Sequence, residues 1–471
     1  MQEAPAENQS SNDSDGSWWS RECGVRELLA SGLPLAVSTA TFAVMNFCDR
    51  LFLTRYDSDV IGPVMVGGAA SWNASAGFIG MALYAIAFVS QYRGSGQPHR
   101  IGAVIWHACA MVFLALPVFA LLAMSAEQVL LMFGHEHGLV EREATYFRIM
   151  LCGMPALIMS MGLNAFFIGL ERTRIVMVLD IAAAVVNVAL DYAWIFGVFG
   201  FPEWGMEGAA WATVTALWIK FVGYLVLVAI QPDVREFGFL SGWRPDWKLF
   251  LSLIRYGGPN GMQFVLEGGA FTIILLFLGE AGDLALEATT LAFSVNMVAF
   301  VPVLGIGMAV TSMVGNQIGR VRPDLAVRAT WSGILVSTIY SVVFVVFYLA
   351  TPTWFLVFHD LENDQHRELL NWTVILLRFV AVYCLFDAWQ VIFASAIKGA
   401  GDTWFTVVAL AVSSVSIILL GVLLRGSFES MSGKLLWWWT LLTLFIVTLA
   451  SAFLWRFLQG AWKSMSVIRE S

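Results

Sequence analysis

Carboxylate and carboxamide side chains recur on one face within two apolar stretches in the first half of the chain. Asp49 follows Asn46 by three residues, and Asp191 follows Asn187 by four. On a helix, side chains with these spacings lie on the same face. Their oxygens suit a hard cation such as Na⁺, and two close carboxylates in apolar surroundings favour sharing a proton. These residues therefore predict a site for a proton or a weakly held Na⁺.

The two aspartates fall at similar depths when each is counted from the preceding arginine. Asp49 lies 23 residues after Arg26, or ~35 Å along a helix, and Asp191 lies 17 residues after Arg174, or ~25 Å. We therefore expect the two carboxylates to approach each other. Two alternatives stay open: Arg50 neutralises Asp49 at the membrane surface, or Asp191 is a buried residue with satisfied hydrogen bonds.

Two further carboxylates fall near the middle of apolar stretches in the second half. Glu267 lies 12 residues after Arg255, or ~18 Å along a helix, and Asp387 precedes Lys398 by 11 residues. A charge at the centre of a membrane helix costs about 2.5–3.5 kcal/mol on insertion scales. Either a function or interactions with other groups must therefore explain why each carboxylate is present. Either each has a function, or hydrogen bonds or Arg378 satisfy it.

The stretches that carry these residues are apolar enough to cross a membrane. Apolar residues make up 59% of the chain and charged residues 13%, against about 45–50% and about 25% in ordinary soluble domains. Only helices satisfy every backbone group within one such segment, so we predict membrane-spanning helices. Twelve are expected, with cores at residues 28–53, 64–90, 101–124, 144–169, 175–199, 208–231, 250–278, 286–314, 329–357, 371–396, 404–424 and 435–457.

Basic residues are concentrated in alternate connections between these spans. With the N-terminus placed inside the cell, 17 of the 26 Lys and Arg residues fall in cytoplasmic segments and seven in outer ones. Cytoplasmic segments of membrane proteins are enriched in these residues. We therefore expect a multi-pass protein of the plasma (inner) membrane with both termini in the cytoplasm.

The two halves of the chain share landmarks at a constant offset. Pro34 and Pro259 lie near the starts of spans one and seven, and the same interval separates Gly94 from Gly319 at the ends of spans two and eight. Because each half holds an even number of spans, both halves have the same orientation, which predicts a parallel repeat with a cavity between the halves. The predicted fold is an all-α polytopic membrane protein with two pseudo-symmetric six-helix bundles.

The expected domains follow from this repeat. They are a disordered cytoplasmic tail (1–24), an N-terminal six-helix bundle (25–231), a linker (232–248), a C-terminal six-helix bundle (249–458) and a cytoplasmic tail (459–471).

Several motifs, taken in order, resemble the multidrug and toxic compound extrusion (MATE) family over roughly residues 25–460. They are Asn187-Val-Ala-Leu-Asp191, Gly205-Met-Glu-Gly-Ala-Ala-Trp-Ala-Thr213, Gly258-Pro-Asn-Gly-Met-Gln263-Phe-Val-Leu-Glu267, Pro302-Val-Leu-Gly-Ile-Gly307, Val314-Gly-Asn-Gln-Ile-Gly319 and Lys398-Gly-Ala-Gly-Asp-Thr403. The resemblance implies an antiporter, not an enzyme. It implies export of organic cations or amphipathic drugs in exchange for H⁺ or Na⁺ by alternating access, without another cofactor.

The resemblance also assigns roles in the first half. It adds Thr213 to the ion-coupling cluster of Asp49, Asn187 and Asp191. Where the family often has a tyrosine one turn before the first aspartate, this chain has Met45, so that hydroxyl is absent. This cluster is also typical of the DinF-like branch of the family.

In the second half, the resemblance implies that Gln263, Glu267 and Asp387 bind the ion or the substrate. This set is typical of the NorM-like branch, so either half can hold the coupling site. The resemblance further suggests that Pro34 bends its helix during substrate release. The alternative is that Pro34 lies in the first turn, where proline disrupts little.

Other classes of function fit less well. A lipid-linked sugar flippase of the same superfamily is the main alternative, but it needs a cationic cavity, and only Lys220 and Arg378 are basic residues within the spans. There is no HExxH or GxSxG motif of an enzyme, and the net charge of −8 does not indicate nucleic-acid binding. His135 and His137 lack further ligands for a metal. We expect a monomer whose partners are small-molecule cations or drugs and membrane lipid.

Three expectations concern packing. Asp180 and Lys220 lie on neighbouring spans and either form an ion pair or reach lipid headgroups and water separately. The run Trp437–Trp439 is typical of an aromatic belt at the membrane surface. The five cysteines are scattered without a disulfide framework, and we expect buried thiols in helices.

Overall fold

The computed structural model describes residues 18–132, 137–350, 364–424, 426 and 430–468, and the regular structure of these residues is entirely helical. The first lobe comprises α1 (Val25–Tyr56), α2 (Ile61–Leu83), α3 (Ala85–Gly94), α4 (Ile101–Cys109), α5 (Val112–Met124), α6 (Ala126–Met132), α7 (His137–Gly169), α8 (Thr173–Ile195) and α9 (Gly205–Ala229). The second lobe comprises α10 (Trp247–Gly279), α11 (Asp283–Gly319), α12 (Pro323–Ala350), α13 (Asp364–Ala400), α14 (Thr403–Leu424) and α15 (Met431–Gln459).

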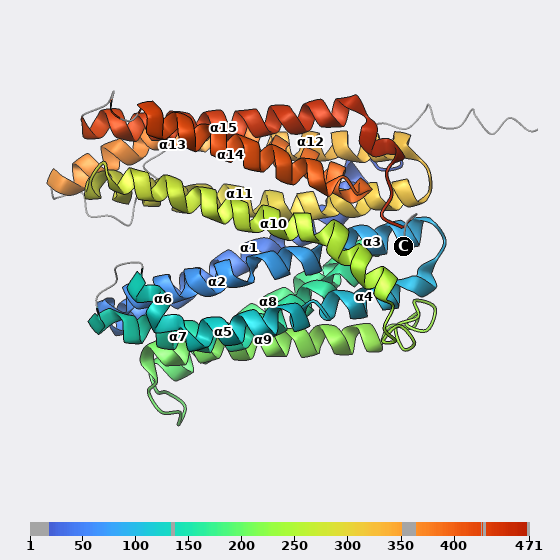
Figure 1. Cartoon of the computed structure of the whole chain (residues 1–471), viewed down its shortest axis with the longest axis horizontal. Coiled ribbons are helices and arrows are strands. Elements are labelled where there is room, and N and C mark those ends of the chain that lie inside the picture. The colour runs from blue at the N-terminus through green and yellow to red at the C-terminus, as the bar shows by residue number, and fades with distance from the viewer. Residues whose placement is uncertain (1–17, 133–136, 351–363, 425, 427–429, 469–471) are drawn as a thin grey trace, which may run out of the picture.

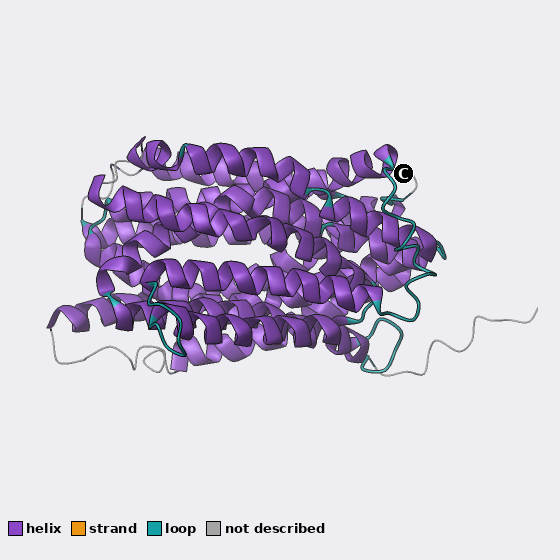
Figure 2. Ribbon diagram, turned by 90° about the horizontal axis from the view of Figure 1, so that it is seen from below, coloured by secondary structure: helices purple, strands orange, loops and turns teal. Residues whose placement is uncertain are grey.

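The predicted spans and fold class are confirmed. Within the described residues, 12 helical segments are long and apolar enough to cross a membrane. Helices α2 and α3 together form the second span, α4 and α5 form the third, and each remaining span is a single helix. Connections lie mainly at the two ends of the helices (Figure 2), where backbone groups can reach water.

The helices form two layers, with α1–α9 in one and α10–α15 in the other (Figure 1). In the first lobe α7 packs against α2 and α9, and in the second lobe α13 packs against α11 and α15. These are equivalent pairs, because the repeat relates span four to span ten, span two to span eight and span six to span twelve. The two lobes therefore share one packing plan.

The contacts between the lobes follow the same repeat. Helix α1 packs on α11, and α2 packs on α10, which is the equivalent contact. Gly80 and Gly305 are equivalent positions in the repeat. They allow α2 to approach α10 and α11 to approach α1 closely. A Cβ atom on Gly80 would lie 2.8 Å from Gly261 Cα, and one on Gly305 would overlap the backbone of Ala36. The predicted pseudo-symmetry is thus present in the packing.

A second glycine pair closes one end of the interface between the lobes. A Cβ atom on Gly94, at the end of α3, would overlap the carbonyl oxygen of Asn316, and one on Gly319, at the end of α11, would overlap that of Gln91. Gln91 and Asn316 are themselves related by the offset of the repeat. Helices α3 and α11 therefore meet in a nearly symmetric backbone contact that leaves no room for a side chain.

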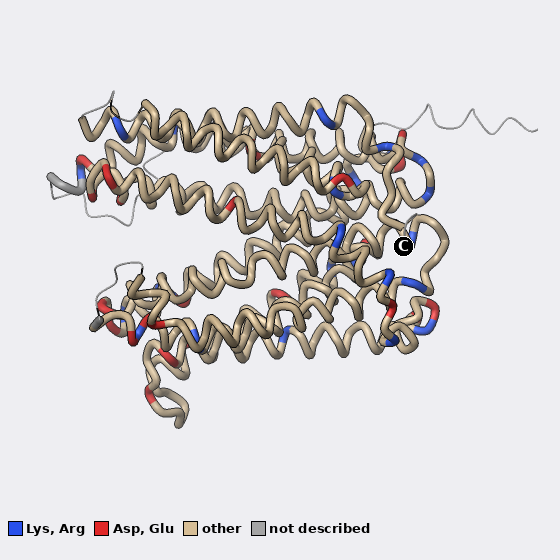
Figure 3. The backbone as a smooth tube through the Cα atoms, in the orientation of Figure 1, with Lys and Arg blue, Asp and Glu red and all other residues tan. Residues whose placement is uncertain are grey.

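Charges divide the molecule into two ends (Figure 3). Lys and Arg gather mostly at the end that holds the described C-terminus, and Asp and Glu prevail at the opposite end. We call these the basic end and the acidic end. Hydrogen bonds between the lobes lie near the basic end, where Tyr84 Oη donates to Lys398 O at 2.8 Å and Ser312 Oγ donates to Ile168 O at 2.8 Å. The lobes are thus fastened together at the basic end.

The segment before α1 packs on the second lobe. Cys23 is buried, its sulfur accepts a hydrogen bond from Gln317 Nε2 at 3.3 Å, and its carbonyl oxygen accepts one from Ser332 Oγ at 2.9 Å. The expectation of a disordered tail over residues 1–24 is therefore wrong for residues 18–24, because these contacts order them. Residues 1–17 lie outside the described part of the chain.

The connection between the lobes, residues 230–246, is held on the first lobe. Phe237 O accepts a hydrogen bond from Gly102 N at 2.7 Å, and Phe239 O accepts one from Trp106 Nε1 at 2.8 Å. Asp233 pairs with Arg172 at 2.6 Å. This connection is therefore packed on the first lobe.

Two expectations about packing are wrong. Trp438 and Trp439 do not form a belt at the membrane surface: both are buried in the second lobe, where Trp438 stacks on Phe277 and Trp439 donates to Thr289 Oγ1 at 3.1 Å. Helix α15 runs between other helices at this level, so indole groups fill its packed faces. Among the free cysteines, Cys152 is exposed instead of buried.

Candidate functional site

The two aspartates predicted in the first half meet inside the first lobe. The carboxyl groups of Asp49 on α1 and Asp191 on α8 lie close enough to act directly on each other. Helices α1 and α8 pack along their length, which brings the two residues to one level. Two carboxyl groups can hydrogen-bond only when one of them carries a proton. One proton between the two carboxyl groups would therefore join them by a hydrogen bond.

Asn187 and Thr213 lie beside this pair. Asn187 Nδ2 is 3.4 Å from Thr213 Oγ1, which joins α8 to α9, and Asn187 lies one turn from Asp191. Within the described chain, no group donates a hydrogen bond to Asn187 Oδ1, and both oxygens of Asp191 lack a donor. A cluster rich in oxygen acceptors and poor in donors suits a hard cation or a proton.

Three residues near the pair were not predicted as members of the site. Tyr146 of α7 is buried and interacts electrostatically with both aspartates. Arg50 acts on Asp49, and Cys48 lies close enough to act on Asp191. A tyrosine in an apolar span carries no signal in one sequence, so only the packing of α7 identifies Tyr146. Arg50 was considered only as a neutralising neighbour.

Two other residues of α1 stay out of the polar cluster. The amide of Asn46 donates to Phe42 O at 2.8 Å, one turn earlier on its own helix. Met45 is buried and supplies no hydroxyl. The predicted group of two carboxylates and two carboxamides therefore has one carboxamide, Asn187, at its centre.

The predicted residues of the second half also come together. Gln263 Nε2 donates to Glu267 Oε1 at 2.8 Å, one turn apart on α10. Asp387 of α13 accepts from Gln390 Nε2 at 3.1 Å and interacts electrostatically with Glu267. Glu267 is exposed although it lies far from both ends of α10, so it lines an open space. Asp387 borders a cavity of about 10 Å³, roughly the size that one water needs.

The basic residue beside this second cluster is Lys398. It interacts electrostatically with Glu267, whereas Arg378 is exposed on α13. Of the alternatives, hydrogen bonds from Gln263 and Gln390 do reach the two carboxyl groups, whereas the basic residue that acts on Glu267 is Lys398 and not Arg378. The second cluster therefore combines two acidic groups with one basic group.

The ion pair between Asp180 and Lys220 is confirmed. Lys220 Nζ lies 2.8 Å from Asp180 Oδ1, and Tyr224 donates to the same oxygen at 2.9 Å. Ser38 of α1 donates to the other carboxylate oxygen. Helices α1, α8 and α9 therefore meet around one fully hydrogen-bonded carboxylate.

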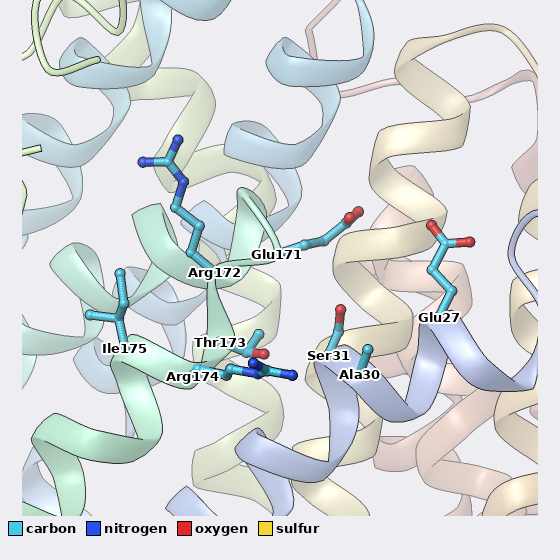
Figure 4. Close-up of a pocket in the computed structure, with 8 residues that line it drawn as sticks. All are labelled: Glu27, Ala30, Ser31, Glu171, Arg172, Thr173, Arg174 and Ile175. Carbon is cyan, nitrogen blue, oxygen red and sulfur yellow. The ribbon is translucent and has the colours of Figure 1, made fainter. Parts of the chain in front are cut away.

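A cavity of about 350 Å³ opens at the basic end of the first lobe, between the first turns of α1 and the turn before α8 (Figure 4). Figure 4 shows Arg174 directed toward Ser31, and Arg172 directed away from it. Thr173 is buried at its wall, and within the described chain its hydroxyl has no hydrogen-bond partner. This cavity was not predicted from the sequence.

Pro34 lies inside α1, well past its first turn, and is buried. The alternative that it occupies the first turn is therefore wrong. Proline removes one hydrogen bond from the helix interior, which weakens the helix there. A bend at Pro34 during transport stays a prediction.

The described residues contain no group of three or more His, Cys, Asp or Glu side chains placed to hold a metal ion. His135 and the side chain of His137 lie outside the residues whose placement is described. The expectation that these two histidines form no metal site is therefore untested.

Comparison with known proteins supports one family. A family model described as MatE matches residues 34–193 and 259–423, which cover the corresponding parts of both lobes. The probable multidrug resistance protein NorM of Xanthomonas axonopodis pv. citri is 27% identical over 380 residues, covering 79% of this chain and 80% of the relative. The multidrug resistance protein PmpM of Pseudomonas aeruginosa is 26% identical over 386 residues, covering 82% and 80%.

Solved structures share the fold. One is described as the outward-facing conformation of a multidrug resistance MATE family transporter of the MOP superfamily; it superposes with a TM-score of 0.82 at 15% identity, covering 94% of this chain and 97% of that one. The eukaryotic MATE transporter AtDTX14 gives a TM-score of 0.81 at 16% identity, covering 93% and 96%. At these identities the likeness concerns the fold alone.

Proposed function

The chain belongs to the MatE family of multi-pass membrane transporters and is not an enzyme. We propose on this basis that it exports organic cations or other amphipathic drugs in exchange for H⁺ or Na⁺. The relatives named as multidrug resistance proteins support the substrate class. No covalent chemistry is involved: transport requires two sites and two conformations of the lobes.

The observation that carries the proposal is the contact between Asp49 and Asp191. Carboxyl groups inside a membrane-spanning bundle are costly, and apolar residues would fill the same space at lower cost. A structural role therefore does not explain this pair, whereas sharing a proton does. Binding of the ion changes the charge between α1 and α8, and α1 is also a main contact to the second lobe. Ion binding can therefore shift the balance between two arrangements of the lobes.

We assign drug binding to the second cluster, around Glu267. Its exposure within the span makes it reachable, and the nearby Asp387 adds a second acidic group. Organic cations are attracted to such a site by charge and by the surrounding apolar surface. We place the basic end in the cytoplasm of the cell, following the enrichment of Lys and Arg there. Both termini then lie in the cytoplasm of a monomer in the inner membrane.

The lipid-linked sugar flippase is disfavoured by the charges within the spans. Lys220 is neutralised by Asp180, and Arg378 is exposed on α13 instead of lying among the buried polar groups. Lys398 acts on Glu267, so the second cluster has one basic group against two acidic groups, which favours a cationic substrate.

The test is transport by purified protein in liposomes. A fluorescent organic cation is offered with an imposed pH gradient, a Na⁺ gradient, both or neither. We expect uptake against the concentration gradient of the dye under at least one ion gradient, and loss of uptake when an ionophore collapses that gradient. Absence of transport under every gradient, by protein that remains folded and monodisperse, would contradict the proposal.

A further inference from the structure

Four buried polar side chains form a stripe along α8. Thr173, Asp180 and Asn187 recur every seven residues, and Asp191 follows one turn later. Seven residues are about two helical turns, so all four face the same way. All four are buried. The stripe reaches from the basic end of the span to the Asp49–Asp191 pair.

Helices α1 and α9 supply polar partners along this stripe. At the level of Asp180, the partners are Ser38 on α1 and Lys220 and Tyr224 on α9. These are the charged and titratable groups that face Asp180 from the helices packed against it. Further along, Thr213 of α9 contacts the asparagine of the stripe. Because α1, α8 and α9 contact one another, these groups form a polar seam within the first lobe.

The seam has an opening at the basic end. Thr173 and Ser31 line the cavity of about 350 Å³ (Figure 4). The buried hydroxyl of Thr173 has no hydrogen-bond partner among the described residues, so it can bind a water in the cavity. Along α8, Asp180 is ~10 Å further in than Thr173, and Asp191 is ~16 Å beyond Asp180. Between them, the stripe face carries the small residues Ala183 and Ala184.

We propose that this seam is the route by which a proton passes between the Asp49–Asp191 pair and the basic end, with Asp180 as the intermediate acceptor. The inference rests on the proposed antiport function and goes beyond it by naming the ion and its path. A carboxyl O–H bond breaks at Asp191 and one forms at Asp180, with water carrying the proton between them. Asp180 then releases the proton to water in the cavity and pairs again with Lys220.

The chemistry of the seam selects a proton over Na⁺. An ammonium group 2.8 Å from Asp180 repels a metal cation from that carboxylate. A proton is disfavoured there too, but it can pass along hydroxyl groups and water by exchange of O–H bonds, whereas Na⁺ needs several oxygen ligands at once and Lys220 already occupies one carboxylate oxygen. The hydroxyls of Ser38 and Tyr224 can both donate and accept, so they can rearrange as Asp180 changes charge. Lys220 is thus a counter-charge that keeps Asp180 ready to release its proton.

The decisive variant is the neutral double substitution Asp180→Asn with Lys220→Met, which leaves no unpaired charge in the membrane. Two rates are measured in liposomes: uptake of a fluorescent organic cation driven by a pH gradient, and exchange of labelled for unlabelled cation without a gradient. Exchange needs the drug site and both conformations, but no net movement of protons. We expect uptake to fall at least tenfold while exchange stays within twofold. Tyr224→Phe, which removes one hydroxyl and keeps the ring, should slow only the driven uptake.

The matched control removes an ion pair at the acidic end, Glu127→Gln with Arg148→Met, where the two charges lie 2.9 Å apart. Both rates should be unchanged in this variant. Equal losses of uptake and exchange in the Asp180/Lys220 variant, or no loss in either, overturn the proton route. Uptake by the unaltered protein under a Na⁺ gradient alone also overturns it, while the export function stands. No transport by the unaltered protein under any gradient contradicts the export function itself.

Discussion

At the scale of single residues, the carboxyl groups inside the spans differ in how they are satisfied. Asp180 accepts hydrogen bonds from two hydroxyl groups and pairs with a lysine. Both oxygens of Asp191, by contrast, have no donor among the described residues. A carboxylate with few donors holds a proton or cation firmly, whereas one with many donors holds a proton only briefly. The two levels of the first lobe therefore have different tasks.

The first prediction concerns the coupling pair. Asp49→Asn and Asp191→Asn should each abolish uptake driven by an ion gradient, because one remaining carboxyl group cannot share a proton with a partner of the same kind. Protein yield and thermal stability should stay near those of the unaltered protein, since an amide preserves the shape. Uptake of a fluorescent cation into liposomes measures this. Asp59→Asn, an exposed position near the same end of α1, is the control and should be fully active. Full transport by either substituted protein would remove that residue from the coupling role.

The second prediction concerns the cluster on α10 and α13. Glu267→Gln and Asp387→Asn should raise the concentration of organic cation that half-saturates transport by about tenfold, equivalent to about 1.4 kcal/mol of lost binding. The dependence on the ion gradient should remain. A neutral substrate of similar size should be affected less, because the lost interaction is with charge. If these variants instead lose all gradient-driven transport while the first-lobe variants keep it, the coupling ion binds in the second lobe.

At this scale the sequence predicted the acidic residues but not all their neighbours. A carboxylate in an apolar stretch is conspicuous because its cost in lipid is high. Tyr146 and the role of Lys398 could not be predicted, since both depend on how separate helices face each other. The buried position of Trp439 was missed for the same reason: its neighbours Thr289 and Phe293 belong to another helix.

At the scale of helices, close approach depends on glycines that the repeat places twice. Gly80 and Gly305 let α2 and α1 reach the opposite lobe, and Gly94 and Gly319 let α3 and α11 touch at the basic end. The sequence revealed the constant offset between the halves, and hence the symmetry, but not that these glycines mark contacts between lobes. Their spacing alone is also consistent with turns, which glycine commonly forms.

The third prediction tests the glycine contact at the basic end. Gly94→Ala and Gly319→Ala should each destabilise the contact between α3 and α11 by about 1–3 kcal/mol, the usual cost of inserting a methyl group into packed structure. Because the overlap is with backbone, no side-chain rotation relieves it.

Transport should slow in both variants, and by similar factors, since the two sites are related by the repeat. Gly62→Ala on α2 is the control, since its added Cβ would meet no atom within 4 Å. Unequal effects of the two substitutions would show that the lobes do not share this contact symmetrically.

At the scale of the whole molecule, the two lobes are held at the basic end by hydrogen bonds that cross between them. Gln91 of α3 donates to Gly399 O at 2.9 Å and accepts from Ser466 Oγ at 2.9 Å and Val467 N at 3.0 Å. Its counterpart in the repeat, Asn316, donates to Glu171 at 3.2 Å. The segment after α15 is therefore part of the closure, as is Cys23 on the N-terminal side.

The thiol of Cys23 reports on this closure. Burial, followed by the nearby Glu27 and Glu22, raises the pKa of Cys23 to about 12. A thiol with that pKa is thiolate in only about one molecule in ten thousand at pH 8, and the thiolate is the reactive form. When the lobes separate at the basic end, Cys23 leaves Gln317 and meets water, so its pKa falls toward the ordinary value and its labelling accelerates. Reaction with a maleimide thus measures the open fraction.

The last prediction follows from Gln91. Replacing it by leucine, Gln91→Leu, keeps the bulk of the side chain but leaves Gly399 O and Val467 N without their partner in the closed state. Unsatisfied buried groups of this kind cost about 1–3 kcal/mol, which shifts the balance between closed and open molecules about 5- to 150-fold. We expect Cys23 to be labelled faster by a factor in this range, measured on its own peptide by mass spectrometry, while the exposed Cys152 in the same protein reacts at an unchanged rate.

Gln97→Leu, an exposed position at the same end, should leave both rates unaltered. Faster labelling of both cysteines would indicate general unfolding instead, and an unchanged rate at Cys23 would mean that Gln91 does not hold the lobes together. Because the same closure must open for an exported drug to enter from the cytoplasm, the labelled fraction should also fall when a gradient of the coupling ion favours the closed state.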